Sequence, residues 1–114
     1  MVSGRPTTAD MVYAGLRRGA AARNAVSVRH GRGALTSVEW ATTLAALYSR
    51  DARWWHILAR ATVTDHTIPM VYVMAASDAE GAALRAAADW AQSARNYART
   101  TAAAATSAAS ARVA

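Results

Sequence analysis

Cysteine, lysine and phenylalanine are all missing from this chain, and proline occurs only twice. Without cysteine, the chain has no disulfide bonds, no thiolate nucleophile and no thiolate metal ligands. Long apolar runs are missing too, since no stretch approaches the roughly 18 residues that a membrane-spanning helix needs. These absences exclude disulfide frameworks and thiol enzymes, and we expect a cytoplasmic protein without a membrane partner.

The apolar residues that are present are mostly small. Hydrophobic residues make up 54% of the 114 residues, but many of them are alanine, which adds little buried area. The large apolar side chains include four tryptophans and four tyrosines. Helices with alanine on their contact faces approach closely, and 114 residues is a usual size for one domain. The composition therefore predicts a thin, closely packed helical domain.

Positive charge is concentrated near the N-terminus. The formal net charge is +6 and the pI about 11.1, and all thirteen basic residues are arginine. Residues 1–35 contain six arginines and a single acid, Asp10, which gives them a charge of +5. This surplus favours polyanionic partners, although the coding bias of a GC-rich genome also produces arginine and alanine in excess.

Local patterns in the first half predict short elements. Thr7, Thr8 and Asp10 offer helix-capping chemistry, and apolar spacing predicts a helix over residues 9–25. Gly15 and Gly19 each weaken such a helix by about 1 kcal/mol relative to alanine. After this helix, the alternating residues 26–29 are compatible with a short strand, and the glycines of residues 30–33 predict a loop.

Capping signals recur further along the chain. Thr36 and Glu39 form an S/T-x-x-E capping box, which predicts a helix to about residue 49. Ser49 or Asp51 then caps a second helix, predicted over residues 52–61.

A break is predicted at residues 65–69, which end in Pro69. Residues 70–74 are rich in strand-forming types, but we favour helix there, with Pro69 at the first helical position. A second capping box at residues 77–80 predicts a long helix to about residue 100.

The resulting fold prediction is mainly α: a small bundle of four to five helices with a long alanine-rich C-terminal helix. The alternative is an α+β fold in which Val26 to Arg29 pairs with Met70 to Met74 as two short strands. Residues 1–100 are predicted as a single helical domain. Residues 101–114, made of alanine, serine and threonine with one arginine and one valine, are predicted as a frayed or disordered tail.

Arginine is the best candidate for a binding function. Guanidinium groups bind phosphates through paired hydrogen bonds, and Arg53 and Arg60 lie beside the adjacent residues Trp54 and Trp55, one of which is a candidate for stacking on a base. The alternative is a solvated basic surface with no partner, with both tryptophans packed. The predicted nucleic-acid-binding residues are Arg17, Arg18, Arg23, Arg29, Arg32, Arg53 and Arg60.

No catalytic or cofactor motif is present. Serine lacks the G-x-S-x-G setting, and there is no glycine-rich phosphate loop. His56, Asp65 and His66 are the closest grouping of histidine and carboxylate, but their spacing matches no zinc site. We therefore predict a protein that is not an enzyme and that binds no metal and no cofactor.

The last helix offers a second kind of function. Trp90, Ala94 and Tyr97 repeat on one side of it and are predicted as an interaction face, either within the chain or between copies. The leading prediction is a small accessory protein that binds nucleic acid or another polyanion through its basic first third. The alternative is a protein–protein interaction or structural module that forms a homo-oligomer, or binds a protein partner, through the C-terminal helix.

Overall fold

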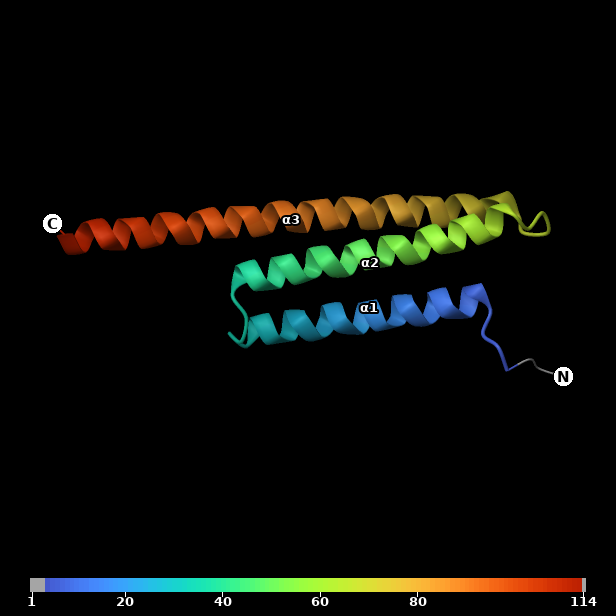
Figure 1. Cartoon of the computed structure of the whole chain (residues 1–114), viewed down its shortest axis with the longest axis horizontal. Coiled ribbons are helices and arrows are strands. Elements are labelled where there is room, and N and C mark those ends of the chain that lie inside the picture. Colours follow the sequence, from blue (N-terminus) through green and yellow to red (C-terminus); the bar gives the residue numbers. More distant parts are fainter. Residues whose placement is uncertain (1–3, 114) are drawn as a thin grey trace.

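The computed structural model describes residues 4–113, and these form three α-helices and no strand. They are α1 (Thr8–Gly31), α2 (Ser37–Val63) and α3 (Met70–Val113), shown in Figure 1. The mainly α prediction is confirmed. The predicted count of four to five helices is wrong, because several predicted elements are joined into longer ones.

Capping boxes start the first two helices. The backbone N–H of Asp10 donates to the Thr7 hydroxyl at 3.0 Å, and the Asp10 carboxylate accepts from the Thr7 N–H at 3.0 Å. Thr36 and Glu39 make the same pair of bonds at 3.0 and 3.1 Å. Each box satisfies backbone donors that a helix start leaves unpaired, so both starts lie where the sequence predicts caps.

The predicted strand pair is wrong. Val26 to Arg29 belongs to α1, which continues to Gly31, and Met70 to Met74 is the first turn of α3. Val26 is buried against Leu44 and Leu47 of α2, because it continues the stripe of α1 that faces α2. Because α1 continues to Gly31, the loop predicted at residues 30–33 begins only after Gly31. Its tight turn falls at Gly33, which has φ +77°.

Two predicted caps lie inside helices. The two helices expected on either side of Ser49 and Asp51 are one continuous α2, in which Asp51 is buried and forms an ion pair with Arg23 of α1. Similarly, α3 begins at Met70, and Glu80 within it accepts a hydrogen bond from His56 of α2 at 3.2 Å. Both carboxylates serve contacts between helices instead of helix starts.

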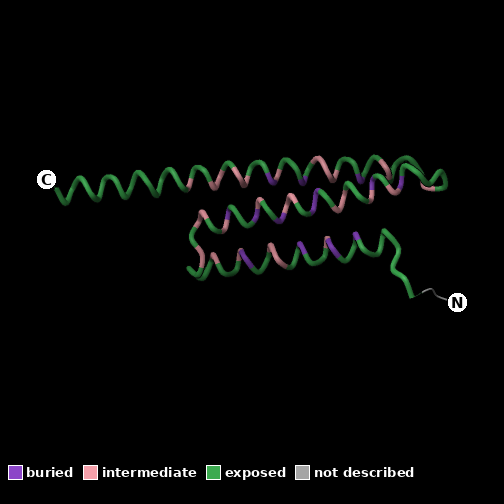
Figure 2. The backbone as a smooth tube through the Cα atoms, in the orientation of Figure 1, coloured by how far each residue is buried: buried purple, intermediate pink, exposed green. Residues whose placement is uncertain are grey.

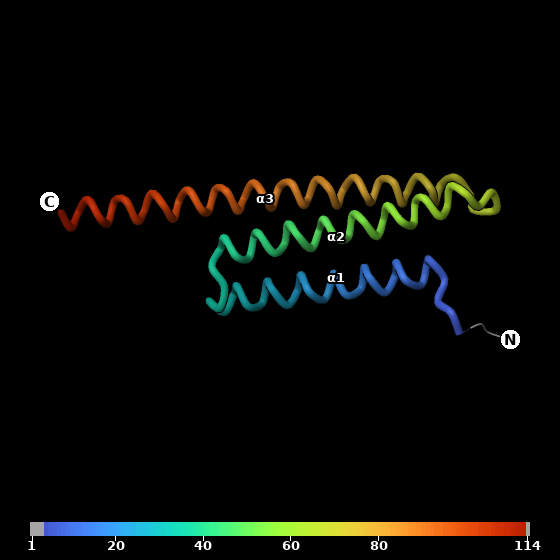
Figure 3. Tube along the Cα trace, viewed as in Figure 1, coloured from blue at the N-terminus to red at the C-terminus, as the bar shows by residue number. Residues whose placement is uncertain are grey.

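The three helices form a single layer. α2 lies in the middle and runs antiparallel to both neighbours, as the trace in Figure 3 shows, while α1 and α3 make no contact in the described residues. The molecule measures 76 × 26 × 16 Å and has a radius of gyration of 19.8 Å. A compact chain of this length would have a radius of about 13 Å, so the molecule is elongated.

Beyond Tyr97, α3 extends past the other two helices. Residues 98–113 are exposed throughout, and Figure 2 shows this part of α3 as a single uncovered rod. The segment predicted as a frayed or disordered tail thus continues α3 as a helix to Val113. Residues 1–3 and 114, which belong to the two predicted domain ranges, lie outside the described residues, and the single domain at residues 1–100 stays a prediction.

Small residues line both seams of the layer. Ala41, Ala52 and Ala59 of α2 and Ala76, Ala83 and Ala87 of α3 are all buried, as the alanine-rich composition predicts. Gly15 and Gly19 of α1 face α2, where a Cβ on Gly15 would overlap the Trp54 indole and a Cβ on Gly19 would overlap the Asp51 carboxylate. The two glycines that weaken α1 as a helix thus admit two side chains of α2.

No helix in residues 4–113 is both long enough and apolar enough to cross a membrane.

We expect Gly15→Ala to destabilise the protein, although alanine is the better helix former. The added methyl group displaces Trp54, and overpacking of this kind costs about 1–3 kcal/mol. Chemical denaturation measures the free energy of unfolding.

The matched control is Gly31→Ala, at the end of the same helix, where a Cβ meets open space. This change should leave the stability equal or raise it by up to about 1 kcal/mol. A Gly15→Ala variant at least as stable as the wild type would show that the seam is loosely packed.

Candidate functional site

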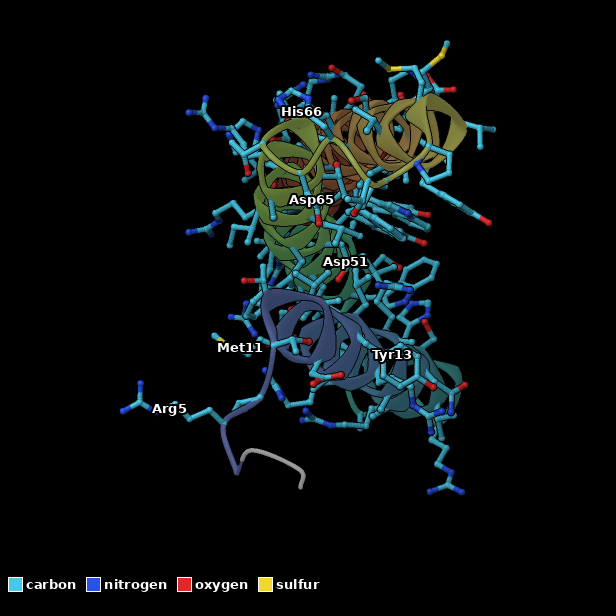
Figure 4. The ribbon with its side chains drawn as sticks, turned by 90° about the vertical axis from the view of Figure 1, so that its right-hand side faces the viewer. Arg5, Met11, Tyr13, Asp51, Asp65 and His66 are labelled. Carbon is cyan, nitrogen blue, oxygen red and sulfur yellow. The ribbon has the colours of Figure 1, made fainter. Side chains whose placement is uncertain are left out.

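Five arginines lie on one outer side of α1 and α2. On α1, Arg18 follows Met11 by two helical turns and Arg29 follows Arg18 by three, so the three residues share one side of the helix. Figure 4 shows Met11 on the opposite side of α1 from Tyr13. We call the exposed set the arginine ridge; its members are Arg18, Arg29, Arg50, Arg53 and Arg60.

The α2 part of the ridge is placed by its neighbours. Trp40 and Tyr48 contact Ser27 and Arg23 on the Tyr13 side of α1. Residues two apart on a helix point about 200° apart, so Arg50 and Arg53 lie opposite Tyr48 and Trp55. The ridge therefore runs along the Met11 side of the layer, over both α1 and α2.

A shallow hollow of about 340 Å³ opens on this side, lined by Arg50, Arg53, Trp54 and Ile57. Trp54 is half-buried, because part of its indole packs on Gly15 and the rest lines the hollow. Arg18 and Arg53 make no hydrogen bond or ion pair with any part of the chain that the structure describes. The guanidinium groups of Arg50 and Arg53 and the indole of Trp54 thus line one hollow.

A second hollow of about 410 Å³ lies at the seam between α2 and α3, beside Arg60. It also contains Glu80, which accepts the hydrogen bond from His56. A carboxylate here repels anionic ligands, so the hollow beside Trp54 is the better candidate for binding phosphate groups.

Three of the predicted binding arginines lie off the ridge. Arg17 stands over the Tyr13 ring at 5.8 Å and donates to its hydroxyl at 3.3 Å, on the other side of α1. Arg32 is the exposed C-terminal cap of α1. Arg23 forms the ion pair with Asp51 and lies over the Tyr48 ring at 4.7 Å. Arg50, outside the predicted set, joins the ridge instead, and its spacing to Arg53 was the signal for it.

Burial at the α1–α2 seam perturbs Asp51. Its Oδ1 atom is buried against Gly19 without a hydrogen-bond partner. Desolvation raises the pKa of Asp51, and the charge of Arg23 opposes this rise without cancelling it. Arg23 is therefore committed to neutralising a buried carboxylate, which accounts for its absence from the exposed binding set.

The exposed capping carboxylates behave in the opposite way. A hydrogen bond from the backbone N–H of Thr36 lowers the pKa of Glu39, and the nearby charge of Arg29 lowers it slightly further. The backbone N–H of Thr7 similarly lowers the pKa of Asp10. Arg29 is thus a ridge member that lies near a counter-charge.

Trp90, Ala94 and Tyr97, the predicted interaction face, are all half-buried. The Trp90 ring meets the Trp40 ring edge to face at 4.8 Å, and both pack against the cluster of Val26, Leu44 and Leu47. His30 stacks on the other side of Trp40 at 4.2 Å, so this column of rings joins all three helices. Part of the predicted face thus packs within the chain.

The described residues contain no group of three or more histidines and carboxylates able to hold a metal ion. His56 and Asp65, which were grouped from the sequence as histidine and carboxylate, make no contact with each other. His56 pairs with Glu80, and Asp65 accepts a hydrogen bond from the backbone N–H of Thr67. Comparison with family models, curated proteins and solved structures gives no match. Function therefore has to be argued from the chain itself.

Stability should respond to acid in opposite ways at Asp51 and Glu39. The pKa of Asp51 is higher in the folded than in the unfolded chain, so the folded state takes up the proton first. The free energy of unfolding of the wild type, minus that of Asp51→Asn, should therefore rise as the pH falls from neutral toward 3.8.

For Glu39 the pKa is lower in the folded chain, so its stabilisation is present above pH 4.5 and is lost as the pH falls through the folded pKa. The same difference, taken against Glu39→Gln, should therefore shrink with acid. Urea titrations between about pH 3 and 7 measure both differences, and two slopes of equal sign would contradict the assignment.

Proposed function

We propose that this protein is a non-enzymatic accessory protein that binds nucleic acid through the arginine ridge. One observation carries the proposal: arginines from two helices, separated by up to 42 positions in the chain, are exposed on the same side of the layer. A partner lying across α1 and α2 contacts all of them at once.

The ridge offers the chemistry that phosphate recognition needs. Guanidinium groups donate forked hydrogen bonds that match phosphate oxygens. Arg53 and Arg60, seven residues apart, are separated by about 10 Å along α2, and neighbouring helix axes lie about 8–10 Å apart. A net charge of +6 attracts a polyanion before contact is made.

Trp54 favours single-stranded partners. Its indole lies in a hollow between two guanidinium groups, so an unpaired base can stack there while the adjacent phosphates meet Arg50 and Arg53. Base–aromatic stacking contributes about 1–3 kcal/mol and tolerates any base. Bases in a duplex are stacked already, so we expect a single strand to bind more tightly than a duplex of the same length. As a nucleic-acid partner protein, it is proposed to be cytoplasmic.

A second candidate function is that of a protein–protein interaction or structural module. It is favoured by the openness of the layer, in which α1 and α3 do not touch and large side chains remain half-exposed. Trp90, Ala94 and Tyr97 are only partly available to a partner, because α2 already covers one side of them.

The binding proposal predicts that Arg18→Gln, Arg50→Gln and Arg53→Gln together weaken binding of a fluorescent oligonucleotide at least about tenfold. Each lost phosphate contact on a single strand also reduces the slope of log K against log salt by about 0.7. Fluorescence anisotropy with single-stranded and duplex DNA, at about 50 and about 200 mM salt, measures both quantities.

The matched control replaces Arg85, Arg95 and Arg99 of α3 by glutamine. This removes the same charge from exposed positions outside the ridge. We expect it to weaken binding much less than the ridge variant does. Equal losses would show that only net charge matters, and an absence of wild-type binding at either salt would rule out the function.

A further inference from the structure

All the aromatic side chains except Trp54 lie on the side of the layer opposite the arginine ridge. We call this surface the aromatic face; it consists of Tyr13, Trp40, Tyr48, Trp55, Tyr72, Trp90 and Tyr97. It draws on all three helices, and its members on α2 run from Trp40 to Trp55, about 22 Å along that helix.

Contacts and helical spacing place these residues together. Trp40 donates from Nε1 to the Ser27 hydroxyl of α1 at 3.1 Å and meets Trp90 of α3. Tyr13 shares the Ser27 side of α1, because the two residues are 14 positions, or about four turns, apart.

The same spacing holds on the other two helices. Trp55 follows Tyr48 by two turns on α2. On α3, Tyr72 lies five turns before Trp90, and Tyr97 lies two turns after it. On each helix the members of the face therefore share one side.

The aromatic face is not covered by the chain itself. None of its residues is buried, and Tyr13 and Tyr72 are 63% and 62% exposed. The other five members are half-buried. Aromatic side chains bury 150–250 Å² each when they are enclosed, so the two tyrosines in particular leave much of that area in solvent. No segment within residues 4–113 folds back over this side.

The chain exposes more surface than a compact protein of its mass. It exposes 8060 Å², whereas a compact monomer of 12.0 kDa exposes roughly 6000 Å². The excess of roughly 2000 Å² is shared by the two sides of the layer and by residues 98–113 of α3, and a standard interface buries roughly 800 Å² of each partner.

Charge selects this side for contact between copies. The two arginines that adjoin the face are both engaged, Arg17 with Tyr13 and Arg23 with Asp51. The opposite side carries the arginine ridge, and two copies brought together there repel each other. Contact through the aromatic faces keeps both ridges apart and in solvent.

We propose that the aromatic face binds a second copy of this chain, so that two layers pack face to face around a twofold axis. The interface is isologous, with the same residues contributed by each copy. A second hydrophobic core, in addition to the cluster of Val26, Leu44 and Leu47, then forms between the two layers. The proposal stands independently of nucleic-acid binding, since it uses the other side of the molecule.

The test is the mass in solution, measured by sedimentation velocity and by light scattering between about 1 and 200 µM. We expect a dimer of twice 12.0 kDa. The double variant Tyr13→Arg with Tyr72→Arg should raise the dimer dissociation constant at least about tenfold, because it removes the two most exposed aromatic contacts of the face and adds like charges. Both tyrosines are mostly exposed within one chain, so circular dichroism should show an unchanged helix content.

The matched control is Met11→Arg with Leu84→Arg. These side chains are 50% and 52% exposed and lie off the aromatic face, Met11 on the ridge side of α1. This variant should remain a dimer with the wild-type dissociation constant. A wild type that stays monomeric at 200 µM overturns the proposal and leaves the face to a different partner. Equal weakening by the two double variants overturns it as well.

Discussion

At the crossing of α1 and α2, Trp54 and Asp51 occupy the space that side chains at Gly15 and Gly19 would fill. This close approach fixes which side of α1 faces α2, and the positions of the remaining α1 side chains follow from helical geometry. The same contact buries a carboxylate and thereby engages Arg23. This contact therefore determines which α1 side chains belong to the arginine ridge and which to the aromatic face.

The single layer extends that division to the whole chain. α2 has a neighbour on each side, and α1 does not contact α3. Each helix is therefore exposed on both faces of the layer, whereas a helix of a closed bundle is exposed only on its outer side. In a closed three-helix bundle the aromatic residues would point inward and the arginines outward. In an open layer both sets are accessible, on opposite sides of the molecule.

Sequence patterns predicted the local features well and the longer-range ones poorly. The capping chemistry at Thr7, the capping box at Thr36 and the helical character of residues 70–74 could be predicted because these signals lie within a few residues. Asp51 and Ser77 have side chains that can cap a helix, but both lie inside helices. The sequence alone does not distinguish a capping position from a position within a helix for such residues. The pairing of Arg23 with Asp51 spans 28 positions and has no local signal, so Arg23 was assigned to phosphate. The ridge residues were partly found because helical spacing determines which of them share a side.

The part of α3 beyond Tyr97 makes no contact with the layer, and this determines its thermal behaviour. Its helix depends on alanine propensity alone, and isolated helices of about 15 residues are only marginally formed in water. We therefore expect the last four turns before Val113 to unwind gradually on warming, as a peptide does, while the packed helices melt together. The end-to-end length of residues 4–113 would then depend on temperature.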